Sequence, residues 1–122
     1  MVQTKHNYKI LQKKEDEKQL QIYAEAALAK GSTNPRELEN LSKTKNKSVL
    51  FWIAHNKYTP PGVLKKLSEH SSPTILAAVA QNINTPNETI HKLKDEADKD
   101  ISDRASVTFK KQTKELLKLW LQ

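Results

Sequence analysis

The 122-residue chain contains no cysteine. It therefore cannot form a disulfide, a thiolate zinc site, an iron–sulfur cluster or a cysteine nucleophile. Small secreted domains usually depend on such cross-links, so their absence favours the cytoplasm. No run of apolar residues approaches the ~20 that a helix needs to span a bilayer, and the first residues lack the apolar segment of a signal peptide. We expect a soluble, cytoplasmic protein.

Residues that carry catalysis or hold cofactors are also scarce. The two glycines form no phosphate-binding motif, and the chain has no Gly-x-Ser-x-Gly sequence. The acidic stretch 95–103 lacks the glycine and the terminal glutamate of an EF-hand loop. No two histidines have the spacing of a helical metal site; they are His6, His55, His70 and His91. We predict a protein that is not an enzyme and that needs no metal or cofactor.

A repeat of 26 residues organises the chain. The stretches 56–67 and 82–93 each place an asparagine three residues before Thr-Pro, followed by apolar residues at helical spacing. The same step relates four columns of apolar residues, which are Tyr23, Val49, Ile75 and Ile101; Ala27, Ile53, Val79 and Ala105; Leu38, Leu64, Ile90 and Leu116; and Leu41, Leu67, Leu93 and Leu119. A fixed period between ~20 and ~50 residues indicates a stacked-repeat protein. We divide the chain into four units, 23–48, 49–74, 75–100 and 101–122.

Each unit reads as two short helices joined at a corner. Asparagine tolerates the left-handed conformation that ends a helix, threonine is a good N-cap, and proline suits the first helical position. In the third unit, Glu88 stands three residues after Thr85, the spacing of a capping box. The first unit has Gly31 as the stop and Asn34-Pro35 as the restart. We therefore interpret the repeated phrase as a helix–turn–helix corner.

Helices of about 8 residues do not persist alone in water, so the units must stack to bury their apolar columns. We predict an all-α solenoid forming one domain over residues 1–122, in which 1–22 is a basic leader and N-terminal cap. The last unit lacks the Thr-Pro corner, so we expect its helices to fuse or to meet at a kink. Leu117, Trp120 and Leu121 would then cover the end of the stack.

Two stretches point to a known family. "VLFWIAHNKYTPPGVLKKL" and "ILAAVAQNINTPNETIHKL" resemble the leucine-rich repeat variant, which is similar in style to HEAT-like helical repeats. The resemblance implies a right-handed solenoid in which α-helices alternate with shorter helices, and it supplies no catalytic residues. Some relatives carry a cysteine-rich segment for an iron–sulfur cluster, a function that this chain cannot have.

Positions that differ between units, while the apolar columns persist, are candidates for contact with a partner. One position runs Ala26, Trp52, Ala78 and Arg104, and its neighbour runs Glu25, Phe51, Ala77 and Asp103. Phe51, Trp52 and Arg104 are therefore our candidate partner-binding residues. The alternative is that Trp52 fills a local gap left by Gly62 or by an alanine.

The net charge of +7 is concentrated in three lysine clusters: Lys9, Lys13 and Lys14; Lys43, Lys45 and Lys47; and Lys110, Lys111, Lys114 and Lys118. The second and third are candidate nucleic-acid-binding sites, since lysines can hold a phosphate backbone without reading sequence. Only two arginines and few aromatic residues accompany them. We therefore expect a protein partner first, with nucleic acid as the alternative.

The basic, Leu/Trp-rich end "KKQTKELLKLWLQ" also suits a membrane surface. We rank that interpretation well below a terminal cap or a contact between two copies. Membrane association is thus unexpected, and a homodimer through the terminal units stays open.

Overall fold

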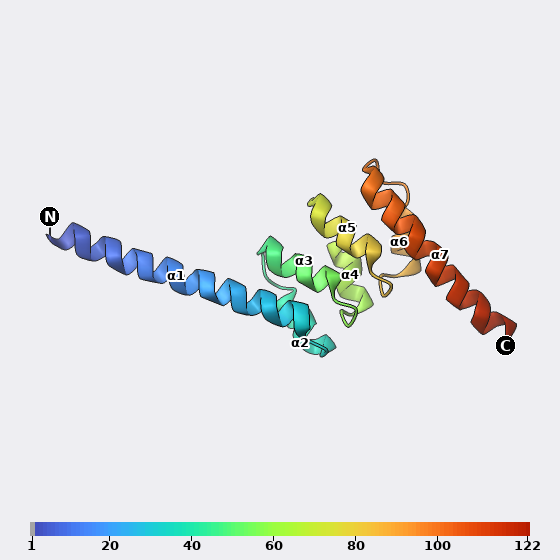
Figure 1. Ribbon diagram of the computed structural model, residues 1–122, viewed down its shortest axis with the longest axis horizontal. Helices are drawn as coiled ribbons and strands as arrows, with labels where there is room; N and C mark the ends of the chain where they lie inside the picture. The colour runs from blue at the N-terminus through green and yellow to red at the C-terminus, as the bar shows by residue number, and fades with distance from the viewer. Residues whose placement is uncertain (1) are drawn as a thin grey trace.

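The computed structural model describes residues 2–122, and their side chains from residue 7 onward. Within this part the chain forms seven α-helices and no strand (Figure 1). The helices are α1 (Val2–Gly31), α2 (Pro35–Leu41), α3 (Lys47–His55), α4 (Pro61–Leu67), α5 (Pro73–Gln81), α6 (Asn87–Leu93) and α7 (Lys99–Leu121). The predicted all-α fold class is confirmed.

The helix bounds keep the 26-residue step over the middle of the chain. The short helices α2, α4 and α6 begin at Pro35, Pro61 and Asn87. The helices α3, α5 and α7 begin at Lys47, Pro73 and Lys99. Side chains cap three of these starts: Asn34, Asn46 and Asp98 accept from the first backbone N–H groups of α2, α3 and α7.

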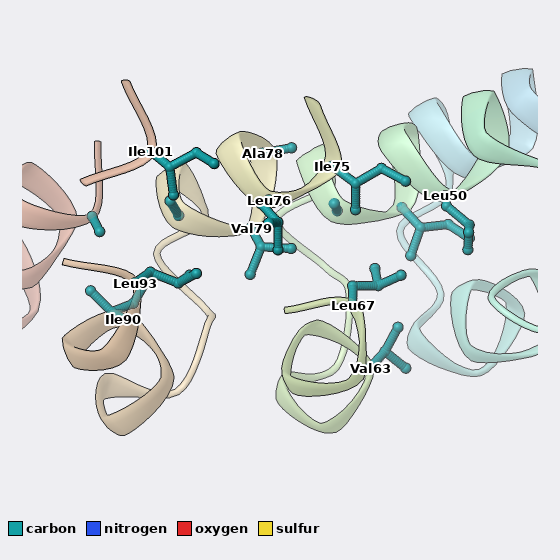
Figure 2. Close-up of a cluster of buried hydrophobic side chains, with 14 of the residues drawn as sticks. Leu50, Val63, Leu67, Ile75, Leu76, Ala78, Val79, Ile90, Leu93 and Ile101 are labelled. Carbon is teal, nitrogen blue, oxygen red and sulfur yellow. The ribbon is translucent and has the colours of Figure 1, made fainter. Parts of the chain in front are cut away.

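The helices α1, α3, α5 and α7 form a row in which each lies beside the next. The helix α3 packs against α1 and α5, and α5 packs against α7 (Figure 1). The short helix α4 contacts α5, and α6 contacts α7. Apolar side chains fill the space between the row α3, α5, α7 and the short helices, as Figure 2 shows for Ile75, Leu67 and Ile90. The N-terminal part of α1 and the C-terminal part of α7 extend away from this core at opposite ends of the molecule (Figure 1).

The corner asparagines have a different role from the one predicted. Asn56 and Asn82 both have φ −80°, and no non-glycine residue of the described part has a positive φ. Instead, each buried side chain reaches back to the preceding unit. The Asn56 Nδ2 donates to the carbonyls of Ala29 and Ser32, both at 2.8 Å.

Asn82 repeats this arrangement one unit further along. Its Nδ2 donates to the carbonyl oxygens of Ala54 at 2.8 Å and of Asn56 at 2.9 Å. Its Oδ1 accepts from the backbone N–H of Asn84 at 2.9 Å, as the Oδ1 of Asn56 does from Tyr58 at 2.8 Å. The two side chains therefore form a ladder, which we call the asparagine ladder, that joins each corner to the one before it.

The predicted threonine caps and the capping box are also wrong. The N-cap residues are Pro60 for α4 and Pro86 for α6, and neither has a side-chain cap. The Thr85 hydroxyl donates backward to the Val79 carbonyl at 2.8 Å, and the Thr59 hydroxyl donates to the Ile53 carbonyl at 2.6 Å. Each threonine thus ties the corner to the last turn of the preceding helix. Its hydroxyl shares the carbonyl with a backbone N–H, that of Asn56 at Ile53 and that of Asn82 at Val79.

The first unit departs from the predicted columns. The corner has five residues in 56–60 and in 82–86, but only three in 32–34, because α1 runs on to Gly31. Because α1 has two more helical residues before its corner, its side chains are rotated about the helix axis by about 200° relative to the equivalent positions of α3 and α5. Tyr23 is consequently 63% exposed and Ala27 is exposed, whereas Ala29 is fully buried. Nor is 1–22 a separate leader, because α1 is continuous from Val2.

The last unit consists of the single helix α7, as the missing Thr-Pro corner suggested. Its column residues Leu116 and Leu119 are exposed rather than buried. Leu117, Trp120 and Leu121 are exposed as well, so they do not cover the end of the stack. The helix continues straight past the core because nothing in its sequence turns it back.

Burial gives the first testable prediction. Ile90→Ala removes a fully buried side chain and should lower the free energy of unfolding by about 2–5 kcal/mol. Leu116→Ala, at the equivalent position of the next unit, should change it by less than about 0.5 kcal/mol, since Leu116 is exposed. Urea denaturation followed by circular dichroism measures both. Equal losses would mean that the end of α7 folds back onto the core.

The asparagine ladder gives the second testable prediction. Asn82→Ala leaves the buried Ala54 carbonyl without its donor, while the Asn56 carbonyl keeps only the N–H of Thr59. The substitution should cost about 1–3 kcal/mol in the same assay. The matched control is Asn40→Ala, an exposed asparagine in α2, for which the change should stay within about 0.5 kcal/mol. If the two substitutions had equal effects, the Asn82 bonds would not hold the units together.

Candidate partner-binding face

The outer side of α3, α5 and α7 carries the residues that vary between units. Each helix turns its regularly repeated apolar residues inward, such as Ile53, Val79 and Ala105. Phe51 and Trp52 of α3 are only partly buried, and alanines stand at the equivalent positions of α5, Ala77 and Ala78. We call this side of the three helices the variable face, because it includes the two variable positions singled out in the sequence.

A hollow lies on the variable face over α5. Ala77 and Ala78 form its floor, because their small side chains leave space between the larger residues of the neighbouring helices. Phe51 and His55 of α3 line one side and Arg104 of α7 lines the other, and the volume of this open hollow is about 310 Å³. The structure thus brings two of the three predicted residues, Phe51 and Arg104, to one site.

An aromatic cluster forms the α3 side of the hollow. The Phe51 ring stacks on the His55 ring, with centroids 5.8 Å apart, and meets the Trp52 ring edge to face at 5.1 Å. Lys30 of α1 places its Nζ 4.8 Å from the centroid of the Trp52 ring, which adds a cation–π contact. Phe51 and Trp52 are half-buried against the core, so the rings are held in place and still present one side to solvent.

Arg104 is held on the opposite side of the hollow. Its Nε lies 3.0 Å from the Asp100 Oδ1 and 3.1 Å from the Oδ2, and a terminal guanidinium nitrogen donates to the Gln81 side-chain oxygen. Gln81 and Asp100 also line the hollow. These two partners orient the guanidinium across α5 and α7.

Two further hollows continue the variable face in both directions. Trp52 lines the first with Lys47 and Phe51, and its volume is about 340 Å³. Arg104 lines the second with Lys111, and its volume is about 400 Å³. Trp52 is therefore beside the central hollow rather than in it. A side chain added at Gly62 would meet nothing within 4 Å, so Trp52 fills no gap there.

The predicted nucleic-acid-binding lysines are exposed but scattered. Lys43 and Lys45 lie in the loop before α3, and Lys47 is the first residue of that helix. Lys110, Lys111, Lys114 and Lys118 follow α7 away from the core, where Lys118 pairs with Glu115 at 3.5 Å. Only Lys47 and Lys111 reach the hollows of the variable face.

Sequence reasoning missed the residues that shape the central hollow. No motif marks any of three residues that line it, His55, Gln81 and Asp100. Two of them belong to the column His55, Gln81, Val107, which varies between units as much as the two columns named above. A comparison of every column that stays outside the core would have found the first two.

Within the described side chains, no group of three His, Cys, Asp or Glu residues is placed to hold a metal ion, and His6 lies outside them. No described helix is long and apolar enough to cross a membrane. No protein-family model, curated protein or solved structure matches the chain. The resemblance to the leucine-rich repeat variant therefore stays a prediction.

The two sides of the hollow differ in what they contribute to stability. Arg104→Ala removes a solvent-exposed ion pair and should change the free energy of unfolding by less than about 1 kcal/mol. Phe51→Ala removes a half-buried ring that packs on the core and should cost about 1–3 kcal/mol. Urea titrations test both values. A loss of more than ~2 kcal/mol for Arg104→Ala would make it a structural residue instead.

Proposed function

We propose that this chain is a non-enzymatic binding module, a short right-handed helical-repeat solenoid of the leucine-rich repeat variant type with four 26-residue units. It works in the cytoplasm, as the lack of cysteine suggests, and it binds an extended segment of a protein along the variable face. The observation that carries the proposal is the central hollow, in which a floor of two alanines lies between held aromatic rings and a held arginine.

Such a site fits the general anatomy of protein interfaces. Partly buried aromatic residues and arginine contribute most of the binding energy in protein–protein contacts, and they act best from fixed positions. The hollow has room for an apolar side chain over Ala77 and Ala78. The Arg104 guanidinium beside it offers donors to a backbone carbonyl or a carboxylate of the same segment.

The charge of the variable face favours protein over nucleic acid. The residues lining its three hollows include three cations and three anions; these are Lys47, Arg104 and Lys111, and Asp98, Asp100 and Asp103. A phosphate backbone needs an excess of positive charge, and the residues lining these three hollows do not provide one.

Nucleic-acid binding is the alternative, through the lysine clusters, of which only Lys47 and Lys111 line the hollows. Lys43 and Lys45 are exposed on the loop before α3, next to Lys47. Reversing the charge of all three would abolish such binding, whereas Arg104→Ala would leave it unchanged.

The proposal is tested by selecting peptides from a random library displayed on phage against the whole chain. Selected peptides should bind Arg104→Ala at least about tenfold more weakly than the wild-type chain. The matched control is Arg36→Ala, which changes the only other arginine, exposed on α2, and should not alter the affinity. Isothermal titration with synthetic copies of the peptides measures the dissociation constants.

Two results contradict the proposal. Peptides that bind both arginine variants with the same affinity would place the binding site elsewhere. Binding of a DNA or RNA oligonucleotide at physiological salt would favour the alternative function if the selected peptides did not compete with it.

A further inference from the structure

The end of α7 is a helix without a partner. Every residue from 113 to 122 is exposed, and Trp120, at 82%, is the most exposed of the large apolar side chains. Four leucines accompany it on this segment, namely Leu116, Leu117, Leu119 and Leu121. We call residues 110–122 the α7 tail.

Apolar and basic side chains are separated around the α7 tail. At 100° per residue, Leu116, Leu117, Leu119 and Trp120 fall within an arc of about 160°. The lysines Lys110, Lys111, Lys114 and Lys118 fall within an arc of about 100° on the other side. Leu121 alone falls among the lysines.

The apolar arc continues the face by which α7 packs on its neighbours. Ile101 and Ala105 are buried on that face, which then extends through half-buried Phe109 to Leu116. Gln112 still contacts the corner 82–86 on this face. From residue 113 onward no other part of the described chain covers it. The tail is therefore not the terminal cap that the sequence favoured, and the main reason for ranking a membrane surface below a cap is gone.

Charge decides whether a second copy of the chain or a membrane surface covers the apolar arc. The α7 tail has four lysines and one glutamate, a net charge of +3. A second tail carries the same net charge and the lysines lie opposite the apolar arc, so pairing of two tails would give the lysines no anionic partner. A helix with leucine and tryptophan on one side and lysine on the other is instead suited to lie in the interface of a membrane that contains anionic lipids.

We propose that the α7 tail binds the surface of anionic lipid membranes, with Trp120 and the leucines inserted between the headgroups and the lysines facing the lipid phosphates. The inference is independent of the function proposed for the variable face. Together, the two sites would hold a protein segment at a membrane surface.

Trp120 provides the test. In a Trp52→Phe chain it is the only tryptophan, so its emission reports on the tail alone. Vesicles of phosphatidylcholine with phosphatidylserine should shift that emission to shorter wavelength and carry the chain into the pellet, whereas phosphatidylcholine vesicles should do neither. Lys111→Glu with Lys114→Glu should weaken sedimentation by about tenfold or more, since each surface lysine contributes to the attraction.

The apolar side has its own variants. Leu116→Ser with Leu119→Ser should remove both the emission shift and the sedimentation. The matched control is Leu20→Ser with Tyr23→Ser, two exposed apolar residues of α1, which should sediment like the parent chain. All four side chains are exposed, so circular dichroism should show the same helix content in both variants.

Three results would overturn the proposal. One is no emission shift with phosphatidylserine vesicles, and another is equal sedimentation with both kinds of vesicle. The third is self-association by a chain that does not bind vesicles. In sedimentation equilibrium without lipid its apparent molecular mass would rise with concentration, and Leu116→Ser with Leu119→Ser would abolish that rise. That result would make a second copy of the chain the occupant of the tail.

Discussion

The structure depends on buried asparagine side chains that connect each corner to the one before it. Asn56 and Asn82 are each only 6% exposed, and each donates to two carbonyls of the preceding unit. An unpaired buried amide or carbonyl is costly, so these bonds allow only one relative position of neighbouring units. Apolar packing alone would tolerate small displacements between short helices. The asparagine ladder therefore fixes the register, while the leucine and isoleucine columns supply most of the burial.

The structure of both ends of the molecule is explained by where the asparagine ladder stops. One step after Asn82 stands Thr108, which cannot make the same bonds, and Gln112 instead donates to the carbonyls of Ile83 and Thr85. Because this contact needs no corner, α7 continues as a straight helix and exposes its tail. At the other end, the three-residue corner 32–34 lets α1 run on in a shifted phase. The variable face lies between these ends, on helices whose inner sides the ladder holds in place.

The sequence predicted the helices well and their side-chain bonds poorly. The 26-residue step set the bounds of the middle helices, since helical spacing and proline positions are local signals. The shift in α1 was not predictable from the apolar columns, because Tyr23 and Ala27 fit them by residue type. Asn82 was expected to act within its own turn, yet its partner Ala54 is 28 residues away, and such long-range bonds leave no local pattern. Phe51 and Arg104 were singled out by their variation between units, whereas the alanine floor between them required the structure.

Hydrogen exchange of the asparagine side chains, followed by NMR, tests the account most directly. The Nδ2 protons of Asn56 and Asn82 should exchange slowly, close to the rate of the most protected backbone amides, because they open only when neighbouring units separate. The side-chain protons of exposed Asn40 should exchange at the rate of a free amide in the same sample. If Asn56 and Asn82 exchanged as fast as Asn40, the asparagine ladder would not hold the units in register, and the account given for the corners and both ends of the molecule would be wrong.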